Sequence, residues 1–473
     1  MPLSITTTVI QKPYVWLLNF NLYLHKLIEE HPKLTENKKF IIIMIIVAVT
    51  LIIDTSFVKI NDLVDKYFIP IQSKLILFSI NSSICLFLQL LAIRYVMNSF
   101  KGKPLTKTPK VRTFYLTSLA SFVVLTFFIG FLVFQLFYYH YYETWINIVI
   151  VSISYGISSV LIIYMAWIFL SWYTSTHDRI VLLYFISMSL IAFHLIVTTL
   201  FIGLKLDDNQ YRVAEYVGGS GDISGGRRPL LDNIYRISSF ISFFSIWMTT
   251  AILMSSYREK LIGEVKYWII LVLPLVYFLI TYFYQFFLSN LLVSHFQNDP
   301  VTVSILVSTF LSLSKPIGGL IFAAAFWNMS RVVGYERKIK LSMVVAGWGI
   351  FFIFSANQAA TQIIVPYPPF GITTVTVLNL ASFLMLLGIY NSATLVSANN
   401  SLRTSLHSYA LKLLRPIGRA EMEKEIRKTV KKVSEHKVLA EISSGESFEF
   451  DENELEKYLK EVIKEIKKES ASK

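Results

Sequence analysis

Long apolar runs separated by short polar or charged segments make up most of the chain between residues 40 and 398. Each run reaches or approaches the roughly 20 residues with which an α-helix crosses about 30 Å of hydrocarbon. The fold class that this pattern predicts is all-α, a polytopic transmembrane helix bundle. We expect about ten spans, at residues 40–58, 74–97, 113–139, 145–172, 179–205, 233–255, 265–293, 301–329, 338–364 and 371–397.

The segments on either side of these runs differ from them in character. An apolar stretch from Tyr14 to Ile28 is interrupted by polar residues and has neither a basic start nor a small-residue cleavage site, so a signal peptide is disfavoured. An interfacial helix beginning at Pro13 fits this stretch better. We therefore expect a cytoplasmic N-terminal segment at 1–39, a transmembrane domain at 40–398 and a charged cytoplasmic helical tail at 399–473.

Narrow apolar stripes mark the tail. The first stripe recurs at helical spacing and consists of Met422, Ile426, Val430 and Val433. Such a stripe on a charged helix resembles a pairing seam more than a broad core face. It predicts docking on a cytoplasmic protein partner or self-association through the tail. The alternative is a solvated helix that only helps to fix the topology.

Composition agrees with a membrane protein. Of the 473 residues 54% are hydrophobic and only 16% are charged, against about a quarter charged in soluble domains. The net charge of +13 is better explained by membrane orientation and by an anionic inner leaflet than by nucleic acid. Cys85 is the single cysteine in the chain, which excludes a disulfide framework and a thiolate metal cluster. The lipid bilayer is therefore the expected partner.

Lys and Arg fall mainly in alternate connections, and this bias indicates the orientation. The connections after the second, sixth and eighth runs are basic, whereas residues 140–143, 294–300 and 366–371 contain no Lys or Arg. Loops 59–73 and 206–232 are mixed, because acidic residues offset their basic ones. The bias places both termini on the cytoplasmic side of a cell membrane and supports an even number of spans.

The sharpest candidate for a functional position is Lys315, which is followed by Pro316. Lys315 lies about fourteen residues from either end of its predicted span, roughly 20 Å along the helix axis, so its ammonium cannot reach the surface. It must pair, meet cavity water or lose its proton. Pro316 removes the hydrogen bond to the carbonyl of Ser312, which predicts a broken-helix binding site beside a buried cation. The alternative is a proline kink, with Lys315 paired to a neighbouring span for assembly.

Other polar residues inside the predicted spans are few. Asp54 is the one carboxylate, and it either pairs inside the bundle or reaches the interface. His194 is either a proton-linked switch or a neutral packing residue. The ninth span carries Asn357, Gln358 and Thr361, which predict either hydrogen bonding between helices or the lining of a cavity. We find no catalytic, cofactor or metal-binding motif.

Two juxtamembrane segments resemble a known family. They are Ser401-Leu402-Arg403-Thr404-Ser405 and Leu414-Arg415-Pro416-Ile417-Gly418-Arg419-Ala420-Glu421-Met422-Glu423-Lys424-Glu425-Ile426. Both are similar to the segment after the last span in an uncharacterised family of multi-pass membrane proteins of ammonia-oxidising archaea. The resemblance implies an archaeal cytoplasmic membrane, and it supplies no catalytic residues.

Three functions are compatible with these features. The first is a membrane sensor or signalling platform whose tail relays the state of the bundle to a cytoplasmic partner. The second is a secondary transporter with a midplane site at Lys315 and Pro316. The third is a lipid-modifying membrane enzyme, which would need a cluster of carboxylates or histidines at the interface. The scarcity of ionisable groups inside the spans favours the sensor.

Overall fold

The computed structural model describes residues 36–66, 71–100, 109–207, 212–214, 229–255, 263–295, 310, 313–333, 337–360, 367–398 and 413–428. The predicted interfacial helix at Pro13, the side chain of Gln358, and Thr361, Val430 and Val433 lie outside the described residues.

The described part of the chain is almost entirely helical. Ten long helices follow one another: α2 (Glu36–Lys66), α3 (Ile71–Phe100), α5 (Pro109–Tyr138), α6 (Thr144–Thr176), α7 (Arg179–Asp207), α8 (Pro229–Met254), α9 (Glu264–His295), α11 (Ser314–Val332), α12 (Arg337–Ala360) and α13 (Ile372–Ala398). A further helix covers residues 414–428. Nine of the long helices are long and apolar enough to cross a membrane. The predicted all-α, multi-pass architecture is therefore confirmed.

The eighth predicted span, 301–329, is described only at residue 310, which is helical, and from residue 313 onward. Its described helix α11 begins at Ser314 and is not among the nine strongly apolar helices. It carries Lys315 in its first turn and Arg331 in its last turn. These two charges and a proline explain why α11 is less apolar than its neighbours.

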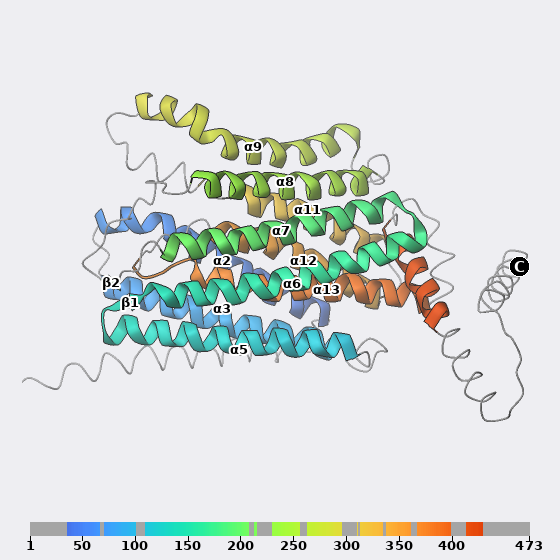
Figure 1. Ribbon diagram of the computed structural model, residues 1–473, viewed down its shortest axis with the longest axis horizontal. Helices are drawn as coiled ribbons and strands as arrows, with labels where there is room; N and C mark the ends of the chain where they lie inside the picture. Colours follow the sequence, from blue (N-terminus) through green and yellow to red (C-terminus); the bar gives the residue numbers. More distant parts are fainter. Residues whose placement is uncertain are drawn as a thin grey trace, which may run out of the picture.

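Two three-residue strands form a small pair that the sequence pattern did not predict. β1 (Tyr141–Glu143) runs antiparallel to β2 (Arg212–Ala214), with Glu143 opposite Arg212. The pair joins the α5–α6 connection to the α7–α8 connection. Both connections therefore lie at one end of the bundle, which we call the strand end. The helix 414–428 lies at the opposite end, which we call the tail end (Figure 1).

Helix α13 lies at the centre of the bundle, with α9 and α5 at opposite edges (Figure 1). It contacts α2, α3, α5, α6 and α12, and its apolar window is 100% buried. Close approach of α12 depends on glycines in both helices. A Cβ at Gly349 would lie 2.5 Å from the backbone nitrogen of Met385, and one at Gly388 would lie 2.5 Å from the carbonyl oxygen of Ser342.

Polar side chains hold α13 to its neighbours. The Gln89 amide donates to the Thr376 hydroxyl at 2.9 Å, and the Ser154 hydroxyl donates to the Val375 carbonyl at 2.6 Å. Hydrocarbon offers no alternative partner to these groups, so such bonds join helices inside a membrane. The small hydroxyl side chains also let the helices approach closely.

Asp54 caps α13 from a different helix. Its side chain is 1% exposed, and Oδ2 accepts from the backbone N–H of Thr374 at 2.9 Å and from the Thr374 hydroxyl at 2.7 Å. The first N–H groups of any helix lack partners within the helix, and a carboxyl group there also meets the positive end of the helix dipole. Asp54 therefore has a structural role at the start of α13.

We expect Asp54→Ala to lower the free energy of unfolding by about 1–3 kcal/mol, because two buried donors lose their acceptor. Thermal unfolding in detergent, followed by circular dichroism, measures the change. The matched control is Thr55→Val, because the Thr55 hydroxyl bonds only carbonyls of its own helix. Equal unfolding temperatures for the two variants would contradict the capping role.

Candidate functional site

The start of α11 places a lysine inside the bundle. Leu313 is the N-cap residue and provides no side-chain cap; the first helical bond runs from the Ile317 N–H to the Leu313 carbonyl at 3.0 Å. Pro316 lies in this first turn, where a backbone N–H would lack a helical partner in any case. The described helix therefore begins beside Lys315 instead of continuing through it.

Lys315 lies deep along the bundle axis. It is separated from Val332, at the tail end of α11, by seventeen residues, or roughly 25 Å of helix. Lys315 and His194, which is near the middle of α7, lie against the same Tyr235 ring. A lysine side chain cannot carry its ammonium to the tail end over such a distance.

The Lys315 ammonium has an aromatic neighbour but no counter-ion among the described residues. The side chain is 6% exposed, and Nζ lies 5.8 Å from the centroid of the Tyr235 ring on α8. No carboxylate in the described ranges forms an ion pair with it. Away from water, a ring face attracts a cation by about 2 kcal/mol, which is less than the free energy of removing an ammonium from water. The cation is thus only partly compensated.

His194 on α7 joins the same group. Its ring centroid lies 5.3 Å from that of Tyr235, and its Nδ1 lies 2.9 Å from the Ser238 hydroxyl. Ser238 donates its one hydroxyl proton to the Tyr235 carbonyl at 2.9 Å, so Nδ1 must be the donor to Ser238. In the neutral imidazole this leaves Nε2 as an acceptor, and Nε2 has no partner in the described structure.

Two more buried polar atoms in this region lack partners. They are the Tyr235 hydroxyl and the Ser314 hydroxyl, for which the described residues supply no hydrogen bond. Buried polar groups are nearly always paired, and a group of unpaired ones needs an explanation. We call Lys315, His194, Tyr235, Ser238 and Ser314 the Lys315 cluster. It offers one cation, hydroxyl groups that can donate, and one ring nitrogen that can accept.

The chemistry of this cluster can accommodate a small anion. A small organic anion could place a carboxylate at Lys315 and a hydrogen-bond donor, such as a hydroxyl, at His194 Nε2. Within the described ranges, no group of three or more His, Cys, Asp or Glu residues could hold a metal ion. The cluster also contains no carboxylate that could act as a base.

The other polar candidates lie outside the cluster. Asn357 on α12 accepts through Oδ1 from the Tyr155 hydroxyl of α6 at 3.1 Å, so its contact joins two helices. Asp54 is occupied by Thr374. The structure thus brings Lys315 and His194 together through Tyr235, and it gives Asp54 and Asn357 partners of their own.

Sequence reasoning missed Tyr235, Ser238 and Ser314. A signal for the first two was present, because buried polar residues recur along one side of α8 at spacings of three, four and seven, at Tyr235, Ser238, Ser242 and Thr249. A polar stripe in an apolar helix indicates the side that faces other helices. Ser314 carries no comparable signal beyond its place beside Lys315.

A second contact region lies at the tail end, where helix 414–428 packs on the bundle. Leu413, just before the helix, is buried, and so are Leu414, Pro416, Ile417, Gly418, Ala420 and Glu421 within it. The Trp172 indole N–H of α6 donates to Glu421 Oε2 at 2.9 Å. Gly418 lies against the side chain of Val396, where a Cβ would clash.

The predicted apolar stripe is only partly engaged in this contact. Met422 and Ile426 are half-buried, so the residues that dock most fully precede the predicted stripe. Burial and the charge of Glu421 raise the pKa of Glu425. A raised carboxyl pKa means that the docked helix favours the protonated form of Glu425. Docking is therefore favoured at low pH, and this stabilisation is lost as the pH rises through the pKa of Glu425.

Comparison of the chain with models of known families, with curated proteins and with solved structures found no match.

We expect Lys315→Met to raise the free energy of unfolding of the ligand-free protein by about 1–4 kcal/mol, because it removes a buried charge that has no counter-ion in the described ranges. Thermal unfolding of the purified protein measures the change. The control is Lys74→Met, since Lys74 is also buried but has an interaction partner and should lose stability. Destabilisation by Lys315→Met would instead favour the assembly role for this lysine.

Proposed function

We propose that the protein is a membrane sensor, in which the bundle binds a small organic anion at the Lys315 cluster and relays its presence to helix 414–428. The observation that carries the proposal is the buried ammonium of Lys315, which has no counter-ion among the described residues. An anion would compensate this charge and also use the unpaired hydroxyl groups nearby.

Binding-site residues often lower the stability of the empty protein, because they are selected to meet a ligand. A buried charge is tolerated where a ligand later neutralises it, and intramembrane ionisable residues mark functional sites for this reason. His194 adds specificity, because its unpaired acceptor favours an anion that also carries a donor. Hydroxy acids carry both groups, a carboxylate and a hydroxyl that can donate a hydrogen bond.

A series of buried aromatic rings runs from α11, the helix that carries Lys315, to the tail helix. Lys315 begins α11, and Phe326 on the same helix lies 6.2 Å from Tyr184 of α7. Tyr184 stacks on Phe169 of α6 at 5.3 Å, and Phe169 contacts Trp172 at 5.3 Å. Trp172 donates to Glu421 of the tail helix. A shift of α11 would therefore press on the residue that binds the tail, through packed groups that cannot deform continuously.

The sensor reading also fits the tail itself. Half-buried Met422 and Ile426 leave part of an apolar stripe available to a cytoplasmic partner. We place this tail on the cytoplasmic side of an archaeal cell membrane. This placement follows the distribution of basic residues and the resemblance of the juxtamembrane segment.

A secondary transporter is the second candidate, and the start of α11 at Lys315 favours it. Transporters place substrate sites at interrupted helices, where helix ends face the ligand. Flux distinguishes the two functions: a sensor binds the anion without moving it, whereas a transporter moves it across a membrane. A lipid-modifying enzyme has no supporting feature in the described part of the chain, because no cluster of carboxylates and histidines is present there.

We expect small carboxylates, and hydroxy acids most strongly, to raise the unfolding temperature of the wild-type protein. A ligand at about one hundred times its Kd contributes about 2.7 kcal/mol. Lys315→Met should abolish this shift, whereas Thr55→Val on α2, whose hydroxyl bonds only carbonyls of its own helix in the described structure, should keep it. The test is a thermal-shift screen followed by titration of each active anion.

Two outcomes would overturn parts of this account. An equal thermal shift in wild type and Lys315→Met would show that the anion does not bind at the Lys315 cluster. Uptake of the active anion into proteoliposomes by wild type, and its loss in Lys315→Met, would replace the sensor with the transporter.

For the relay, we expect the anion to change the distance between spin labels at Lys424 of the tail and Val160 of α6, both of which are exposed. Phe326→Leu should keep anion binding but reduce the change, because it removes the ring that meets Tyr184. Phe322→Leu is the matched control, because Phe322 contacts Phe243 and Phe354 instead. Pulsed electron paramagnetic resonance measures the distances between the two spin labels. An unchanged distance at saturating anion would exclude the relay.

A further inference from the structure

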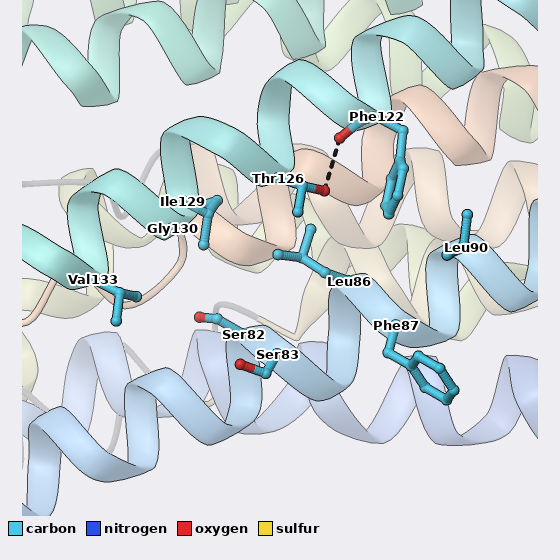
Figure 2. A pocket seen from close by; sticks show the side chains of 10 residues that line it. All are labelled: Ser82, Ser83, Leu86, Phe87, Leu90, Phe122, Thr126, Ile129, Gly130 and Val133. Atoms are coloured by element: carbon cyan, nitrogen blue, oxygen red, sulfur yellow. Dashed lines mark hydrogen bonds between the residues drawn. The ribbon is translucent and has the colours of Figure 1, made fainter. Parts of the chain in front are cut away.

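A groove between α3 and α5 forms a second feature of the bundle. Its volume is about 350 Å³, and side chains from both helices point into the space between them (Figure 2). The α3 side includes Leu86, Phe87 and Leu90, and the α5 side includes Phe122, Ile129 and Val133. The lining is therefore mostly apolar.

The polar groups near the groove are largely satisfied. The Thr126 hydroxyl donates to the Phe122 carbonyl at 2.8 Å (Figure 2), and the Ser82 hydroxyl bonds that of Thr373 at 2.7 Å. A Cβ at Gly130 would meet no atom within 4 Å. The groove thus has open space on an apolar surface, which suits a hydrocarbon chain.

Two arginines lie on α3 and α5 between the groove and the tail end of the bundle. Arg94 follows Leu90 by one helical turn on α3, in line with Leu86 and Leu90. On α5, Arg112 leads through Tyr115 and Leu119 to Phe122 at spacings of three and four, so these residues share a face. Both arginine side chains are exposed, and neither forms an ion pair within the described structure.

The length of this arrangement matches one lipid. Residues 82 to 94 span roughly 18 Å of helix, and one leaflet contributes about 15 Å of hydrocarbon. A chain lying in the groove would therefore place its headgroup beside Arg94 and Arg112. Arginine binds phosphate oxygens well because its donors form a planar fork.

We propose that the groove between α3 and α5 is a specific site for an anionic phospholipid of the leaflet at the tail end, with one acyl chain in the groove and the phosphate at Arg94 and Arg112. This site does not depend on the function proposed for the Lys315 cluster. It lies on different helices, and its ligand is a lipid rather than a soluble anion.

The test measures retained lipid by native mass spectrometry, after extraction of the full-length protein from vesicles of equal phosphatidylcholine and phosphatidylglycerol. We expect wild type to retain one phosphatidylglycerol. Gly130→Leu should reduce this retention at least about tenfold by filling the groove. The matched control is Gly203→Leu on α7, where a Cβ also meets no atom within 4 Å, and it should retain the lipid.

The double variant Arg94→Gln with Arg112→Gln tests the headgroup separately. We expect it to retain phosphatidylcholine and phosphatidylglycerol equally. Retention of phosphatidylglycerol by Gly130→Leu at the wild-type level would contradict binding of the acyl chain in the groove. Equal retention of the two lipids by wild type would overturn the anionic preference.

Discussion

Hydrocarbon offers no hydrogen bonds, and this constraint decides where each polar side chain of the bundle points. Polar side chains on α2, α3, α5 and α6 turn inward and meet α13, whose apolar window is fully buried. Asp54 is the strongest example, because one carboxyl oxygen satisfies two donors at the start of the central helix. The same rule makes unpaired polar atoms in the interior informative.

Most of the spans could be predicted from the sequence, because hydropathy is a local property and the length of a span is set by the membrane. The break beside Lys315 was also predictable, since proline acts on its own helix. The partners of the buried residues were not predictable. That His194 meets Tyr235, that Asp54 caps α13 and that α13 is the central helix all depend on how helices pack. Likewise, docking of the tail begins at Leu413 and Leu414, ahead of the predicted stripe, because Gly418 allows close approach to Val396.

The surroundings of α13 and the Lys315 cluster differ in charge. Around α13 most polar groups are paired, and the exceptions among the described residues include the uncharged oxygens Ser118 Oγ and Asn379 Oδ1 and the second oxygen of Asp54, Oδ1. At the cluster a cation, two hydroxyl groups and a ring nitrogen remain unpaired in the described structure. Proteins depart from the rules of stability mainly where they bind or react. The aromatic chain from Phe326 to Trp172 then connects this departure to the tail helix.

We propose that the Lys315 ammonium, which has no counter-ion among the described residues, binds an anion instead. The most direct measurement is an electron cryo-microscopy map of the full-length protein in lipid nanodiscs, collected with and without the anion that gives the largest thermal shift. We expect density that is not protein within hydrogen-bond distance of Lys315 Nζ only when the anion is present. A carboxylate of the protein itself in that position, in both maps, would contradict the claim.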